Sequence, residues 1–291
     1  MKATLDCLEC VMKQALRAAR IATDDPAVQR RILDETARRI PTLDIEDSPA
    51  VVSLCVYELA AEISGNADPY RNQRQIQNAE ALRMEPELRA LLAESPDPLV
   101  TALHLAAAGN VIDLGTQHSD HINLAAAIEQ AMQEQFAVDH TAAFRESLRR
   151  SRTVLLFLDN AGEIVFDKLL IEQLQRHAVV TAVVKGGPII NDAIREDAEQ
   201  VGITELCEVI DNGGAFVGSP LSRLSSAFRA RMDRADMIVG KGQGNYETLD
   251  AYPGDVFLIL RAKCEVVARH MGVQLGQIGL ISTRRRRSEG A

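Results

Sequence analysis

Acidic and amide side chains stand at the point where an apolar run of this sequence stops. The run TVLLFL (residues 153–158) is followed directly by Asp159 and Asn160, and Glu163 comes three residues later. Carboxylate and amide oxygens are the ligands that Mg²⁺ and Mn²⁺ prefer in proteins. The same residue types also cap helices, so the segment taken alone supports either a metal site or a helix start.

Later apolar runs end in residues of complementary chemistry. The side chains after these runs that could bind a ligand are Lys185, Asp192, Lys241, Asn245 and Lys263. Lysines beside glycine-rich turns, whose backbone N–H groups point outward at helix N-termini, favour a phosphate ligand. A hard divalent metal beside such groups is the setting of phosphoryl transfer. Each residue can also be explained without a ligand, since a lysine after a strand is commonly solvated and Asp192 is a good helix cap.

These residues need a scaffold that brings separate segments together. Short β-branched runs at 153–158, 178–184, 204–210, 236–240 and 255–260 alternate with helical patterns at 162–176, 191–201 and 219–233. This alternation predicts parallel strands joined by crossover helices. Ligands of an open parallel sheet bind beyond the carboxyl ends of its strands. We therefore expect an open, doubly wound (Rossmann-like), mainly parallel α/β domain over 151–291, with a short basic C-terminal tail and one convergent site.

The first 150 residues have a different pattern. Apolar side chains recur three and four residues apart, which predicts a mostly α-helical domain (1–150), a bundle that packs on the α/β domain. The segment GNVIDLG (109–115) places Asn110 and Asp113 in a glycine-flanked loop that could close over a substrate, an ordinary interdomain turn being the alternative. His118 and His121 are interpreted as surface or capping residues.

Composition excludes several classes of protein. The 291 residues include 41 acidic and 32 basic ones, and a net charge of -9 argues against a binder of nucleic acid or of anionic membranes. We find no apolar run long enough to span a membrane and no signal peptide, so we expect a cytoplasmic protein. The sequence gives no indication of the oligomeric state.

The cysteines are interpreted as reduced thiols, because an odd number, five, does not suggest a disulfide framework. Cys7 and Cys10 share one helix face in CLEC, where they can pack, form a redox pair or bind a soft metal. Zinc needs a second such motif or a histidine partner, and the sequence offers neither clearly.

Four segments occur together in the order of a known family: LFLDNAGEIVFDKLL, VVKGGPIINDA, IVGKGQGNYETL and LILRAKC. With CLEC, NADPY and GNVIDLG, they resemble the short microbial branch of the DUF89 family, the damage-control (ARMT1-like) metal-dependent phosphatases, over nearly the whole chain. The resemblance implies an α-helical N-terminal part on an α/β part, and a metal held by Asp159, Asn160 and Asp192.

The resemblance also implies where the substrate binds. Glu163, Asn245 and Lys263 stand at the family's substrate contacts. Larger eukaryotic members carry an acid where this chain has Gln243, and an Arg-Thr motif where it has LRAK. These departures concern the substrate, not the metal.

We therefore expect hydrolysis of phosphate monoesters of small metabolites, such as sugar phosphates or damaged phosphometabolites. The metal is Mn²⁺ or Mg²⁺, with Co²⁺ and Ni²⁺ as alternatives. Asp159 is expected to be a ligand, because an aspartyl-phosphate route of the haloacid-dehalogenase type needs a second acid where this chain has Ala161.

In this hypothesis Lys263, helped by Lys185, draws charge from the phosphoryl oxygens. The water that attacks in line is either bound to the metal or oriented by an acid. Glu163 either orients that water or binds the substrate. Two other classes of function remain: a nucleotide- or cofactor-binding module without hydrolysis, and a thiol-based redox or metal-binding protein that uses Cys7 and Cys10.

Overall fold

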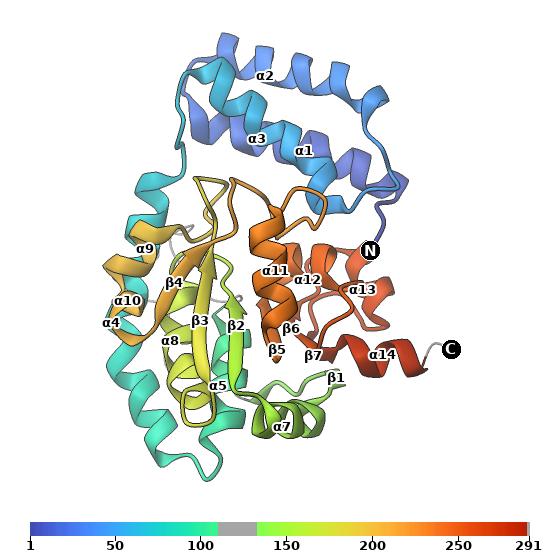
Figure 1. Cartoon of the computed structure of the whole chain (residues 1–291). Helices are drawn as coiled ribbons and strands as arrows, with labels where there is room; N and C mark the ends of the chain where they lie inside the picture. Colours follow the sequence, from blue (N-terminus) through green and yellow to red (C-terminus); the bar gives the residue numbers. More distant parts are fainter. Residues whose placement is uncertain (110–132, 290–291) are drawn as a thin grey trace.

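The computed structural model describes residues 1–109 and 133–289 (Figure 1). Asn110, Asp113, His118 and His121 lie outside the described residues, so their roles stay predictions. Within the described part of the chain, no helix has the length and apolar character that crossing a membrane requires.

In the part of the chain that the structure describes, one sheet of seven strands forms the centre of the molecule. The strands are β1 (Val138–Asp139), β2 (Thr153–Phe157), β3 (Val179–Val184), β4 (Glu208–Asp211), β5 (Met237–Lys241), β6 (Val256–Arg261) and β7 (Ile278–Ser282). Their order is β1-β7-β6-β5-β2-β3-β4, and every pair is parallel except β6 with β7. The predicted mainly parallel α/β sheet is confirmed.

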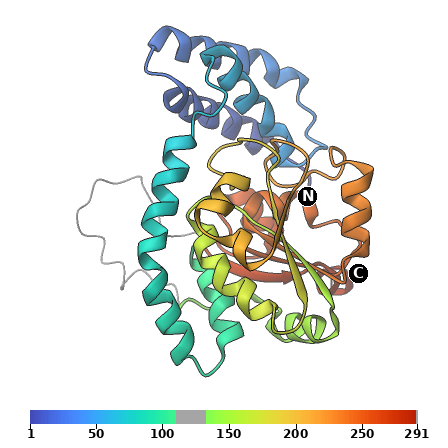
Figure 2. The same cartoon turned by 60° about the vertical axis from the view of Figure 1, so that its left-hand side comes forward.

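Helices cover both faces of this sheet, which explains why its central strands β2, β3, β5 and β6 are mostly apolar on both faces. Val154 and Leu156 of β2 pack in one buried core, and Leu155 and Phe157 pack in the other. The first face is covered by α4 (Arg71–Glu94), α5 (Pro98–Ala108), α7 (Thr141–Arg150) and α8 (Glu163–Leu174), and the second by α11 (Ser226–Arg234), α12 (Gly242–Leu249) and α13 (Glu265–Met271) (Figure 2). The last helix is α14 (Thr283–Glu289).

Some predicted elements differ in their bounds. The expected strand 204–210 is only β4, because Gly202, with a φ of 79°, starts the short helix α10 (Ile203–Leu206) in front of it. The expected helix 191–201 is shortened to α9 (Arg195–Gln200). The helix expected from residue 219 begins seven residues later, after Ser225, whose side chain accepts a hydrogen bond from the Phe228 N–H.

Three N-terminal helices form a unit that we call the helical cap: α1 (Leu5–Ala22), α2 (Pro26–Arg39) and α3 (Pro49–Ser64). A turn, η1 (Ile40–Thr42), follows α2. The buried core of the cap is made mainly by its own helices, with Val266 of α13 packed into it, and the cap lies over one end of the α/β part (Figure 1). By contrast, α4, α5 and α7 share the buried core of the sheet. The helices of the first 150 residues thus divide into two groups, and a domain boundary near residue 150 stays a prediction.

Candidate active site

The loops that follow β2, β3, β5 and β6 meet beneath the helical cap. β2 lies between β3 and β5, and the chain crosses to the other side of β2 after β4. A change of direction of this kind leaves a crevice at the carboxyl ends of the strands, which is where α/β proteins bind ligands. The predicted site residues Asp159, Asn160 and Asp192 line one cavity there, of about 1100 Å³.

Backbone hydrogen bonds hold the two ligand-bearing loops together. The Ala193 N–H donates to the Asp159 carbonyl (2.7 Å), and the Ala161 N–H donates to the Asn191 carbonyl (2.8 Å). Asn160 and Asp192 form an isolated antiparallel bridge between these bonds. The bridge brings the first pair of predicted ligands beside the third, although they follow different strands.

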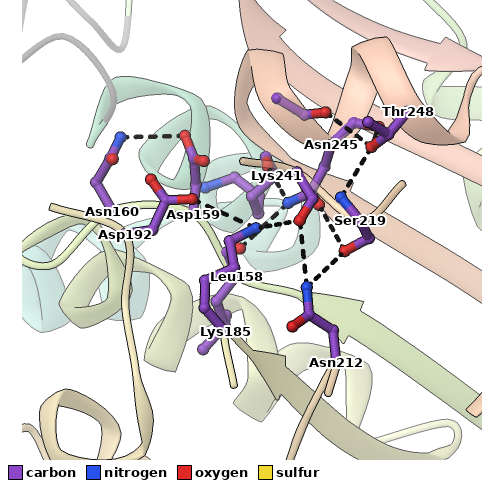
Figure 3. A network of polar contacts seen from close by, with 12 residues as sticks. Leu158, Asp159, Asn160, Lys185, Asp192, Asn212, Ser219, Lys241, Asn245 and Thr248 are labelled. Carbon is purple, nitrogen blue, oxygen red and sulfur yellow. Dashed lines mark hydrogen bonds and ion pairs between the residues drawn. The ribbon is translucent and has the colours of Figure 1, made fainter. Parts of the chain in front are cut away.

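The Asn160 side chain is oriented by both neighbouring acids, and Figure 3 shows its contact with Asp159. Its Nδ2 donates to Glu163 Oε1 (2.7 Å) and to Asp159 Oδ2 (3.1 Å). Asn160 Oδ1 accepts no hydrogen bond from a described residue, so this oxygen is available as a ligand. Glu163 therefore has a clear positioning role: it turns the Asn160 amide.

Burial makes the acids of this cluster costly to ionise without a cation. Asp159 and Asp192 are 7% and 4% exposed. Burial raises the pKa of Asp159 well above its usual range, and the charges of Glu163 and Asp192 raise it further. Burial also raises the pKa of Asp192, although Lys185 opposes this rise.

Two buried carboxylates and one amide oxygen fit a hard divalent cation such as Mg²⁺ or Mn²⁺. Within residues 1–109 and 133–289, no three His, Cys, Asp or Glu side chains are grouped as a metal site. A metal here therefore depends on the Asn160 oxygen as well as on Asp159 and Asp192.

Gly242 forms the wall against which Asp159 rests. It has a φ of 79°, in the left-handed region that favours glycine. A Cβ atom at this position would lie 1.8 Å from Asp159 Oδ2. The glycine after Lys241 is therefore required both by the backbone turn and by the carboxylate.

Lys241 and Asn245, which were predicted to bind the substrate, do not line the cavity. The Lys241 ammonium is 2.7 Å from Asp167 Oδ1 beneath the site, and both side chains are fully buried. Asn245 Nδ2 donates to the Leu158 and Lys241 carbonyls, and its Oδ1 accepts from the Ser219 hydroxyl (Figure 3). These two side chains hold the strand ends together, and their substrate contacts stay a prediction.

Lys185 is also occupied by protein groups. Its Nζ donates to the Gly218 carbonyl (2.8 Å) and lies 3.4 Å from Asp192 Oδ2. Lys185 is 3% exposed and does not reach the wall of the large cavity, so its contribution there is the charge that it places beside Asp192.

Lys263 does line the cavity, and its side chain is exposed. Its backbone N–H donates to Gln243 Oε1 (3.0 Å), and Gln243 Nε2 donates to Glu247 Oε1 (2.9 Å). Gln243 thus connects the loop after β6 to helix α12. Glu247, a buried acid on the cavity wall, was not among the predicted site residues.

Glu247→Gln should make the stability of the metal-free protein less dependent on pH. Burial raises the pKa of Glu247 to about 7, from 4.5 for an unburied glutamate. A carboxyl group that binds its proton more readily when folded stabilises the protein as the pH falls through this window, and that contribution is lost as the pH rises to 7. Between about pH 7.5 and about pH 5, wild type should gain on the order of 2 kcal/mol more unfolding free energy than the variant. Urea titrations with a chelator measure this, and equal pH dependence would contradict it.

Helix α1 forms the opposite wall of the cavity, and both thiols of CLEC face it. Cys7 is buried and Cys10 is exposed, and both are free. Cys7 Sγ accepts from the Thr4 N–H, and Cys10 Sγ accepts from Gln14 Nε2. The two thiols are therefore part of the cavity wall, and Gly109, just before the undescribed segment, lines it as well.

A buried polar cluster on α4 supports the ligand loop from behind. Asn78 Oδ1 accepts from the Gly162 N–H (2.7 Å), and Asn78 Nδ2 donates to Asp197. Arg74 pairs with Asp197 and, by two hydrogen bonds, with Asp68 of the NADPY segment. Arg74 and Asn78 were not among the predicted site residues. A buried polar residue on an otherwise ordinary helix gives no signal until its partner is known.

Comparisons with known proteins agree with the whole architecture. A family model described as the damage-control phosphatase ARMT1-like domain matches residues 3–278. The chain is 32% identical to damage-control phosphatase PH1575 of Pyrococcus horikoshii, with 96% of this chain and 97% of that protein covered. It is also 32% identical to a damage-control phosphatase of Archaeoglobus fulgidus, with 96% and 98% covered. An uncharacterized protein of Methanocaldococcus jannaschii is 34% identical over 93% of this chain and 92% of its own length.

A solved structure shares the fold. The crystal structure of a DUF89 family protein from Pyrococcus horikoshii has a TM-score of 0.89 and 31% identity, and it covers 97% of this chain and 99% of its own. The family model spans the helical cap and each of the strands β1 to β6, whose loops carry the site. The chain therefore belongs to the damage-control phosphatase ARMT1-like (DUF89) family.

Proposed function

We propose that this protein is a metal-dependent phosphatase that hydrolyses phosphate monoesters of small metabolites. Two relatives of nearly full coverage carry the name damage-control phosphatase, which supports a phosphatase role in general. The observation that carries the metal-dependent part is the cluster of Asp159, Asn160 and Asp192. These side chains present buried oxygen donors to the same cavity that Lys263 lines.

Asp159, Asn160 and Asp192 would hold the metal. A divalent cation in this position supplies charge stabilisation to the phosphoryl oxygens and lowers the pKa of water. Asp159 serves as a ligand and not as a nucleophile, because Gly242 fixes its carboxylate from one side and the Asn160 amide bonds to it.

Lys263 binds the transferring phosphoryl group in this mechanism. Lys185 and Lys241 are each bonded to a carboxylate, whereas the Lys263 ammonium has no described ion pair and lines the cavity. Its charge stabilises the oxygens as negative charge develops on them. Glu163 keeps the Asn160 oxygen turned toward the ligand position, and its carboxylate lies where it can orient the attacking water.

The test is a phosphatase screen of phosphorylated metabolites with Mg²⁺, Mn²⁺, Co²⁺ and Ni²⁺ supplied one at a time. Release of phosphate should require a metal. Asp159→Ala, purified in parallel, serves as the blank, and circular dichroism checks that it is folded. If no metabolite is turned over with any metal, or if folded Asp159→Ala is fully active, the proposal fails. Nucleotide binding that is independent of divalent metal would then favour a binding module.

A further inference from the structure

Some of the cationic side chains that line the cavity are paired with an acid, and others have no such pair among the described residues. Among the described residues, the cationic side chains that line it are Lys13, Arg17, Lys263 and Arg269. Lys13 is paired with Glu9 (2.7 Å) and Arg269 with Asp6 (2.7 Å). Arg17 and Lys263 have no ion pair and no side-chain hydrogen bond within the described part of the chain. Because Lys263 is assigned to the phosphoryl group, Arg17 is left as a second cation with no ion pair among residues 1–109 and 133–289.

Arg17 lies at a different end of the cavity from the paired Arg269, whereas the paired Lys13 is about one turn of α1 away. Asp6 and Arg17 are separated by eleven residues of α1, which corresponds to roughly 16 Å along the helix axis. The Asp6 end is next to α13, which carries Arg269. The Arg17 end faces Tyr57 of α3 and Tyr70, which precedes α4.

Tyr57 connects this end to the metal ligands. Burial raises the pKa of Tyr57, the negative charge of Asp192 raises it further, and the positive charge of Arg17 opposes the rise. Tyr57, Asp192 and Arg17 all line the cavity, and the Tyr57 hydroxyl bonds to Gln14, about one turn of α1 before Arg17. A molecule whose phosphate lies at the metal ligands can extend past Tyr57 and reach Arg17.

The other polar groups at this end are largely occupied. The Tyr57 hydroxyl donates to Gln14 Oε1 (2.6 Å), and Gln77 Oε1 accepts from Asn191 (3.1 Å). Arg17 and Gln73 line the cavity and bond to no described side chain. A guanidinium presents a planar set of donors that matches a carboxylate or a phosphate, whereas a hydroxyl group uses only part of it.

We infer that the Arg17 end of the cavity binds a second anionic group of the substrate. This inference rests on the proposed function and narrows its substrate class. The preferred substrates are phosphate monoesters that carry a carboxylate or a second phosphate at the end remote from the transferred group. Neutral polyol phosphates of the same length are poorer substrates.

The experiment compares ligands that differ only at the remote end. Sorbitol 6-phosphate ends in a neutral hydroxymethyl group, 6-phosphogluconate ends in a carboxylate, and sorbitol 1,6-bisphosphate ends in a phosphate. With Mn²⁺, wild type should turn over one or both of the substrates with an anionic remote end with a kcat/KM about tenfold or more above that for sorbitol 6-phosphate. The two arms show whether the site prefers a carboxylate or a phosphate.

Arg17→Gln should remove this preference. Its kcat/KM for the better anionic substrate should fall about tenfold to a hundredfold, because a hydrogen-bonded charge contact is lost, while that for sorbitol 6-phosphate stays within about twofold. Arg20→Gln is the matched control, since Arg20 is an exposed arginine on the same helix that does not line the cavity. It should leave the preference intact. An equal loss on all three substrates, or the same effect in both variants, would overturn the inference.

Calorimetry separates this inference from the proposed function. The three compounds are titrated into Mn²⁺-loaded wild type, Arg17→Gln and Arg20→Gln. Binding of an anionic-end compound that depends on Arg17, without hydrolysis, would retain the second-anion site and reject the phosphatase. Hydrolysis that does not depend on Arg17 would retain the phosphatase and reject the second-anion site. If none of the compounds binds or reacts, the second-anion site is rejected.

Discussion

Gly242→Ala is expected to abolish metal-dependent phosphatase activity as completely as the loss of Asp159 itself. The added Cβ would lie 1.8 Å from Asp159 Oδ2 and 2.1 Å from its Cγ, so the carboxylate must leave its place. Displacing a catalytic group by about an ångström is enough to lower rates about a hundredfold, and here the displaced group is a proposed metal ligand. Phosphate release at saturating Mn²⁺ and calorimetric Mn²⁺ binding measure the effect.

The control for this substitution is Gly65→Ala. Gly65 ends α3 with a φ of 70°, so alanine meets similar backbone strain there, but nothing lies within 4 Å of its Cβ position. Both variants should lose about 1–2 kcal/mol of stability from the left-handed backbone, and only Gly242→Ala should lose the metal. Normal Mn²⁺ affinity in Gly242→Ala would show that Asp159 is not a ligand.

Lys241→Met is expected to lower the free energy of unfolding by about 3–5 kcal/mol, because it leaves Asp167 as an uncompensated buried charge. Lys241 and Asp167 are 1% and 0% exposed, and Asp167 Oδ2 has no described hydrogen-bond partner. Burial raises the pKa of Asp167 to about 6 even with Lys241 beside it. Urea unfolding followed by circular dichroism at neutral pH measures the loss.

Two further variants show where that loss comes from. Lys241→Met/Asp167→Leu should regain most of the stability, since an apolar pair can replace a buried ion pair. Lys168→Met removes a less buried pair, with Glu85, on the same face of the sheet and should cost less. A double variant as unstable as Lys241→Met alone would mean that the unpaired carboxylate is not the cause.

The convergence of Asp159, Asn160 and Asp192 could be predicted from the sequence because parallel strands place the loops that follow them at the same end of the sheet. That rule concerns the backbone and holds whatever the side chains do. It also located Lys263 on the cavity wall correctly, because the loop after β6 ends at the same edge.

The rule does not say toward which side a strand-end side chain turns. Lys241 precedes a glycine with a left-handed backbone and finds an acid on α8, far earlier in the chain. Asn245 lies in the first turns of α12 and bonds back to the strand ends. Nothing in the local pattern distinguishes these side chains from ones that face a ligand, because their partners are distant in sequence.

The helical cap was predictable as helices but not as a wall of the site. Helical periodicity identifies the apolar face of α1, and it leaves open what the polar face meets. That Cys10 and Arg17 line the cavity becomes apparent only when α1 is placed over the strand ends. Strand β7 was missed although Gly272 and Gly276 mark turns before it, because its apolar run is short and it pairs antiparallel to β6, unlike the parallel strands that the alternating pattern predicts.

The position of β2 in the sheet affects the order in which the site can assemble during synthesis. Val154 pairs with Val180 on one side and with Met237 on the other. Contacts between segments so distant in sequence form slowly, because a long loop must close before they are gained. A nascent chain that has reached β4 already contains Asp159 and Asp192, but β2 is still an open edge and Gly242 has not been made. The loops that carry Asp159 and Asp192 are therefore synthesised before Gly242, which forms the wall beside Asp159. A chain that stops short of β5 exposes the carboxylates that the finished protein buries.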